Sequence, residues 1–324
     1  MSPAQFDPRQ FPRNSKHELE LEFEAQGHWL TMPVLLARGE LAGPTLVVSA
    51  GVHGDEFEGV RTIFDVYRGL DSVSMAGDFL AVPVVNGPAF WNCSRTSPLD
   101  GGNLARVFPG RPDGSPTEVI AWHFDQRILA HADFYLDLHS AGVACAMPAL
   151  VGYAADDLRS RAAAFAFGAP VVWGHPSIPP GRTVSAARAR GIPFLYTEAR
   201  GAGRIHPDDL SLYTRGVWNL LKHLEIVAGD AEPAPCRYHL FGDGNIDESL
   251  NAAQPGFLVS EVSLLARVER GQLLGSLLDL RGRVLEQYRA PSSGRVVLIH
   301  ECPRVTAGEP LFLITQEAAE DSRN

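Results

Sequence analysis

Residues 47–56, which read Val-Val-Ser-Ala-Gly-Val-His-Gly-Asp-Glu, decide how this chain is organised. The apolar start of this stretch predicts a strand that is buried on both faces of a sheet. Its two glycines then allow a sharp turn, so His53 and Glu56 are expected on a strand-to-helix loop. Open α/β sheets build their sites at such strand ends. An imidazole and a carboxylate three residues apart can both bind one Zn²⁺ ion, but a further ligand is required.

Composition limits the classes of protein to consider. The chain has 324 residues, of which 45% are hydrophobic, so we expect a large core and about two domains. The net charge of −10 and the pI near 5.5 argue against a nucleic-acid or anionic-membrane partner, which would require clustered Lys and Arg. The four cysteines are widely spaced, and no apolar stretch resembles a signal peptide or a membrane span. We therefore expect a soluble cytoplasmic protein with reduced thiols.

Strand and helix patterns alternate through about residue 228, which predicts an α/β domain over residues 1–235 with a mixed sheet flanked by helices. Strands are expected at residues 17–24, 29–36, 46–48, 79–85, 133–138, 149–153, 171–173 and 192–197. Helices are expected at residues 56–70, 117–129, 156–167, 184–190 and 207–226, with Thr117 as the N-cap of the second. Residues 89–116 show no periodicity and contain Arg95, Asn103 and Arg106, so this long loop is expected to be functional.

The pattern changes after residue 235. Short apolar runs at residues 256–262, 264–268, 271–278, 294–299 and 311–314 are separated by Gly, Pro and charged residues. Such runs predict a smaller all-β domain over residues 236–324.

His139 is the candidate third ligand because it follows a predicted strand at Asp137-Leu138, as His53 follows its own strand. In a parallel sheet both strand ends lie at the same edge. His53, Glu56 and His139 then form a His₂Glu site with an open fourth position, which is typical of catalytic zinc. Water at that position would have its pKa lowered from 15.7 toward about 7.

Hydrolysis of an amide also requires a proton shuttle, and Glu198 at the end of a predicted strand is our candidate. Arg95 or Arg106 could polarise a carbonyl or hold a substrate carboxylate. Each residue also has a structural interpretation. His139 could be a hydrogen-bonded core histidine, Glu198 a surface carboxylate, and the two arginines solvated loop residues.

The joint order of these residues favours function, because it resembles a known family. The ordered motifs are Gly51-Val-His53-Gly-Asp-Glu56, Arg95, Asp100-Gly-Gly-Asn103-Leu-Ala-Arg106, Asp137-Leu-His139 and Thr197-Glu198. This set resembles the succinylglutamate desuccinylase/aspartoacylase family, deacylases within the zinc carboxypeptidase-like fold.

The resemblance implies one Zn²⁺ per chain on His53, Glu56 and His139, with Glu198 as general base and Arg95 near the scissile carbonyl. It also implies that the second domain is a barrel-sandwich-like module covering the mouth of the active site. The family commonly carries Asn before the second arginine, where the pair grips a substrate carboxylate. This chain has Ala105 there, so Arg106 and Asn103 are the expected substrate-binding residues.

The reaction we expect is zinc-dependent removal of the acyl group from an N-acyl amino acid or a related small amide. A metallocarboxypeptidase acting on peptides uses the same chemistry, but it needs a secure grip on a terminal carboxylate, and Ala105 disfavours such a grip. A non-catalytic zinc-containing binding protein and an α/β protein without metal are further alternatives. The acyl group, the amine and the existence of a homo-oligomer are left open by the sequence.

Overall fold

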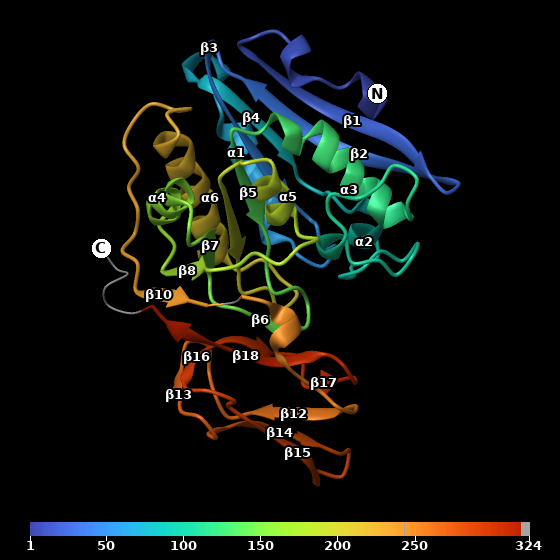
Figure 1. Ribbon diagram of the computed structural model, residues 1–324, viewed down its shortest axis with the longest axis vertical. Coiled ribbons are helices and arrows are strands. Elements are labelled where there is room, and N and C mark those ends of the chain that lie inside the picture. The colour runs from blue at the N-terminus through green and yellow to red at the C-terminus, as the bar shows by residue number, and fades with distance from the viewer. Residues whose placement is uncertain (243, 319–324) are drawn as a thin grey trace.

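The computed structural model describes residues 1–242 and 244–318 (Figure 1). Its helices are α1 Glu58–Gly69, α2 Gly87–Trp91, α3 Pro116–Arg127, α4 Leu158–Phe167, α5 Thr183–Ala189 and α6 Pro207–His223. The strands of the first part are β1 Ser15–Ala25, β2 His28–Arg38, β3 Leu41–Ala50, β4 Ala76–Val82, β5 Phe134–Leu138, β6 Cys145–Ala146, β7 Leu150–Ala154, β8 Val171–His175 and β9 Phe194–Glu198. Those of the second part are β10 Tyr238–Phe241, β11 Leu250–Asn251, β12 Gly256–Ser260, β13 Arg267–Val268, β14 Leu273–Leu278, β15 Val284–Arg289, β16 Gly294–His300, β17 Arg304–Val305 and β18 Pro310–Glu317.

The main sheet is mixed, as predicted, and runs in the order β1-β2-β4-β3-β5-β9-β7-β8-β10-β18-β16-β13. Strand β3 lies inside it and pairs in parallel with both β4 and β5, while β5 pairs in parallel with β9. The parallel strands β3, β5 and β9 therefore end at one edge of the sheet. This arrangement brings together the loops that follow them.

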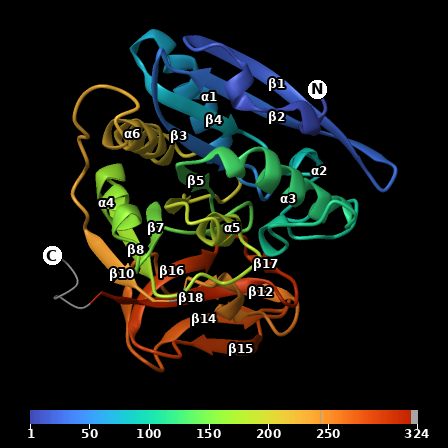
Figure 2. The ribbon, with the colours of Figure 1, turned by 45° about the horizontal axis from the view of Figure 1, so that its top comes forward.

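Helices cover both faces of this sheet, so β3 is buried on both sides. Leu46 and Val48 pack in a cluster that includes side chains of α1, α4 and α6, whereas Val47 packs with side chains of α3 and α5 on the opposite face. Figure 2 shows α4 and α6 on one side of β5 and α3 on the other. Leu46, Val47 and Val48 are all fully buried, which confirms the predicted core strand.

The second part of the chain forms an antiparallel sheet in the order β15-β14-β12-β17 and also extends the main sheet. Strand β10 makes the connection, because it pairs in parallel with β8 and antiparallel with β18. The expected division between residues 235 and 236 falls just before this strand. Figure 1 shows the C-terminal strands gathered at one end of the molecule, next to β6 and β10.

The start of α3 differs from the prediction that Thr117 is the N-cap. Ser115 is the cap, since its hydroxyl accepts a hydrogen bond from the Glu118 amide and the Glu118 side chain accepts one from the Ser115 amide. Pro116 fits the first helical position because it lacks an amide hydrogen. Thr117 instead donates its amide and its hydroxyl to Asp100. No helix of the described chain is long and apolar enough to cross a membrane.

Candidate active site

The loop after β3 carries His53 and Glu56 and depends on two glycines. Gly51 adopts a φ of 60°, in the left-handed region that favours glycine. At Gly54 the backbone passes so close to α2 that a β-carbon would lie 2.0 Å from the carbonyl carbon of Ala89. A larger residue at either position would move the loop that presents His53.

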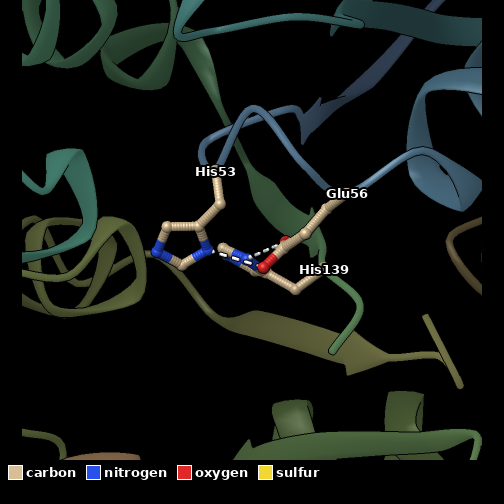
Figure 3. A group of neighbouring side chains, drawn as sticks. All are labelled: His53, Glu56 and His139. Carbon is tan, nitrogen blue, oxygen red and sulfur yellow. Dashed lines mark hydrogen bonds and ion pairs between the residues drawn. The ribbon is translucent and has the colours of Figure 1, made fainter. Parts of the chain in front are cut away.

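His53, Glu56 and His139 converge at the ends of β3 and β5 (Figure 3). Nδ1 of His53 lies 2.7 Å from Oε1 of Glu56, and Nδ1 of His139 lies 2.9 Å from Oε2. One ligand atom from each residue lies within 4.8 Å of the others, and His53 and Glu56 are buried. The sequence-predicted His₂Glu set is therefore brought together in space.

A second carboxylate fixes the orientation of His139. Its Nε2 lies 2.9 Å from Oδ2 of Asp137, which also accepts hydrogen bonds from Ser49 and Thr183. The Tyr213 hydroxyl donates to the His139 carbonyl oxygen at 2.6 Å. These contacts turn Nδ1 toward Glu56, in the manner of the carboxylate–histidine pairs that support metal ligands.

Burial and charge set the protonation of this group. Burial lowers the pKa of His53 to about 4, and the positive charge of Arg95 acts in the same direction. For His139 burial also lowers the pKa, but the carboxylates of Asp137 and Glu56 outweigh it and raise the pKa well above its ordinary value. The two imidazoles likewise overcome burial and lower the pKa of Glu56. These shifts favour the ionised form of Glu56 and the neutral form of His53, and they favour the protonated form of His139.

This donor set fits a Zn²⁺ ion. Two imidazole nitrogens and a carboxylate oxygen point into one buried space, and Zn²⁺ accepts such ligands at roughly 2.0–2.2 Å. In the described chain no other group of three or more His, Cys, Asp or Glu side chains is so placed.

A cavity opens next to the three residues and contains all of the other predicted active-site side chains except Asn103. Its lining includes Arg95, Arg106 and Glu198. Residues 244–246 and Leu313 line it from the second part of the chain. The cavity therefore lies where the two parts of the chain meet.

Glu198, the last residue of β9, lies in this cavity with its Oε2 shut off from solvent and without a hydrogen-bond partner among the described residues. Burial, together with the negative charge of Glu56, raises the pKa of Glu198 to about 8. Arg95 approaches from the long loop, with its Nη1 3.4 Å from Oε1 of Glu56.

Arg106 and Asn103 have different surroundings. The side-chain oxygen of Asn103 accepts a hydrogen bond from the Ala105 amide and caps the short 3₁₀ turn Leu104–Arg106, and this side chain is not among those that line the cavity. Arg106 lines the cavity, but its Nε and Nη2 bind Asp247 at 3.0 and 2.9 Å. Sequence reasoning did not find Asp247, which lies 141 residues from Arg106.

Comparison with known protein families agrees with this geometry. Residues 42–224, more than half of the chain, match the model of the succinylglutamate desuccinylase/aspartoacylase catalytic domain. The chain belongs to this family. The deacylase is also 32% identical to an N-alpha-acetyl-L-2,4-diaminobutyric acid deacetylase of Halomonas elongata, over 87% of this chain and 84% of that protein. Both findings confirm the resemblance that the ordered motifs indicated.

Solved structures agree with the family. A succinylglutamate desuccinylase from Silicibacter sp. TM1040 is 27% identical, with a TM-score of 0.85 over 95% of this chain and 97% of that one. The product-bound ectoine utilization protein from Ruegeria pomeroyi is 28% identical, with a TM-score of 0.85 over 94% and 97%. The deacylase is therefore a hydrolase that acts on carbon–nitrogen bonds other than peptide bonds.

Proposed function

We propose that this deacylase hydrolyses the amide bond of an N-acyl amino acid and depends on one Zn²⁺ ion held by His53, Glu56 and His139. The observation that carries the proposal is the buried convergence of these three side chains beside Glu198, in the cavity that also holds Arg95 and Arg106. A bound Zn²⁺ would supply Lewis-acid activation of the attacking water and of the scissile carbonyl.

Glu198 is the proposed general base and acid. Its carboxylate takes a proton from the attacking water and then gives it to the departing amine. A carboxyl group whose pKa lies near neutrality can both accept and release a proton during turnover, and burial beside Glu56 supports such a value here. The buried Oε2 supports the same role, because no hydrogen bond among the described residues occupies this oxygen.

Arg95 and Arg106 are the proposed cationic groups of the site. Arg95, close to Glu56, would stabilise the negative charge that develops on the carbonyl oxygen. Arg106 would bind the carboxylate of the amino acid, since a guanidinium matches a carboxylate with two hydrogen bonds. Asn103 would contribute to substrate binding through the 3₁₀ turn that it caps, which presents Arg106 to the cavity.

The chemical class of the proposed substrate guides the choice of compounds to test. An N-acetyl amino acid with a free carboxylate, such as the Nα-acetyl-diaminobutyrate named for the Halomonas relative, is the first substrate to test. We further propose that residues 236–324 form a β-rich domain that covers the mouth of the site. The lining of the cavity by residues 244–246 supports this. The four free cysteines agree with a cytoplasmic protein.

The test is hydrolysis of a panel of N-acyl amino acids and of peptides with a free C-terminus by the zinc-loaded protein and its Glu198→Gln variant. We expect turnover of at least one N-acyl amino acid, little release from peptides, and a loss of about 10²–10⁴-fold in kcat for Glu198→Gln. Full turnover by Glu198→Gln with zinc bound would overturn the role of Glu198. Preferential cleavage of peptides would support the carboxypeptidase alternative.

A further inference from the structure

The guanidinium group of Arg106 is fully engaged on the edge that normally receives a carboxylate. Its Nε lies 3.0 Å from Oδ2 of Asp247 and its Nη2 lies 2.9 Å from Oδ1, so the two groups meet side by side. Its Nη1 donates to the carbonyl oxygen of Ala105 at 2.9 Å. A second carboxylate cannot take the Nε and Nη2 positions while Asp247 holds them.

Asp247 reaches Arg106 from the second part of the chain. It belongs to the 3₁₀ turn Ile246–Glu248, and Asn245 caps this turn by accepting a hydrogen bond from the Asp247 amide at 3.2 Å. The Asn245 side-chain oxygen also accepts a hydrogen bond from Arg182 at 2.7 Å. Asn245 and Ile246 line the cavity, so the Arg106–Asp247 ion pair lies at its rim.

We propose that Asp247 is a specificity-determining residue: its carboxylate holds Arg106 when no substrate is bound, and the carboxylate of a substrate or product must displace it to be gripped by Arg106. This inference rests on the proposed function, in which Arg106 binds the amino-acid carboxylate. Asp247 then weakens the binding of every ligand that carries this carboxylate, including the released amino acid.

The exposure of the pair makes such a displacement feasible. The Asp247 side chain is 55% exposed and the Arg106 side chain 25% exposed, so water screens the attraction between them. The hydrogen bonds from Arg106 lower the pKa of Asp247, which keeps this carboxylate charged at neutral pH. Asp247 therefore competes with the substrate carboxylate for Arg106. Its side-chain carboxylate has the same charge and shape as the substrate group, and its ion pair with Arg106 is of modest strength.

Steady-state kinetics on two matched substrates tests the inference. The first substrate is an N-acetyl amino acid that the wild-type protein hydrolyses, and the second is the same compound with its carboxylate converted to a carboxamide. Asp247→Asn and Asp247→Ala should lower KM for the carboxylate substrate by about 2–5-fold, as expected for the loss of a partly exposed ion pair. The KM for the carboxamide should change by less than about twofold. Glu248→Gln removes the same charge from the exposed neighbour and should leave both values unchanged.

The Arg106→Gln background shows whether the effect passes through Arg106. There the Asp247→Asn substitution should no longer lower KM, because Asp247 then has no Arg106 guanidinium to occupy, and its remaining ion pair, with Nη2 of Arg182 at 4.0 Å, is the same in both backgrounds. An unchanged or raised KM in Asp247→Asn would overturn the inference and make Asp247 a residue that positions Arg106. An equal decrease for the carboxamide would overturn it as well, because the effect would not depend on the carboxylate.

A binding measurement keeps the two proposals separate. The N-acetyl amino acid is titrated into zinc-loaded Glu198→Gln protein and into Glu198→Gln/Asp247→Asn protein, neither of which is expected to consume it. Tighter binding to the second protein supports the role of Asp247 even if the wild-type protein hydrolyses no member of the panel. Equal binding contradicts it, whatever the outcome for the proposed function.

Discussion

Nε2 of His139 lies 2.9 Å from Oδ2 of Asp137, while Nδ1 on the other side of the same ring faces Glu56. Asp137 is fully buried and accepts further hydrogen bonds from Ser49 and Thr183. The ring of His139 is thus held between two carboxylates, which fixes the nitrogen that it presents to the proposed metal site.

Replacing Asp137 should therefore weaken metal binding without removing a metal ligand. We expect Asp137→Asn to raise the Kd for Zn²⁺ by about 10–100-fold, the usual cost of losing such a support. Competition with a chromophoric chelator measures this Kd. Asp113→Asn, a charge removal at an exposed position, is the control and should leave the Kd unchanged.

Stability should depend on β3 far more than on exposed apolar residues. Leu46 is fully buried inside the main sheet, so Leu46→Ala should lower the free energy of unfolding by about 2–5 kcal/mol. Leu280→Ala deletes the same atoms from a side chain that is 96% exposed and should change it by less than about 0.5 kcal/mol. Urea unfolding followed by circular dichroism compares the two variants. Equal losses would contradict the position of β3 in the core.

Binding of Zn²⁺ should release protons in a manner that depends on Glu198. The pKa of Glu198 is raised to about 8 in the metal-free protein, so this group is mostly protonated at pH 7 and ionised at pH 9. A nearby cation favours the ionised form of Glu198, so zinc binding releases the Glu198 proton at pH 7. At pH 9 Glu198 is already mostly ionised, and zinc binding releases little from it. The contribution of Glu198 to the protons released per zinc should therefore fall as the pH rises through about 8.

Calorimetric titrations in two buffers with different enthalpies of ionisation count these protons. At pH 7 Glu198→Gln should release up to one proton fewer than the wild-type protein, whereas at pH 9 the two should agree. His139, whose pKa is also raised, contributes to both proteins equally. Identical release by both proteins at pH 7 would show that zinc binding does not change the protonation of Glu198 and would contradict this prediction.

The sequence predicted the centre of the molecule because local patterns determine it. The apolar run before Gly51 specifies a buried strand, His139 follows the end of β5, and Glu198 is the last residue of β9. Parallel pairing of β3, β5 and β9 then brings these strand ends to one edge. Ordered motifs and sheet geometry were enough to find the predicted ligand set.

The features that the sequence did not predict depend on contacts between distant segments. No local pattern near Asp247 indicates a partner 141 residues earlier in the chain. Strand β10 is short, and its place is determined by the free edge of β8 and by β18 rather than by its own residues. At the start of α3 both Ser115 and Thr117 suit an N-cap, and Pro116 at the first helical position decides between them.

Zinc content of the purified protein tests the central claim most directly. Wild-type protein, His53→Ala, His139→Ala and the control His123→Ala are each loaded with Zn²⁺, dialysed and analysed by atomic emission spectroscopy. His123 is on α3, where its ring packs against that of Phe23 at a tilt, and it does not line the cavity. We predict close to one zinc per chain in the wild-type and His123→Ala proteins and a large loss in the other two. Equal zinc in all four proteins, or none in the wild type after loading, would contradict the proposed site.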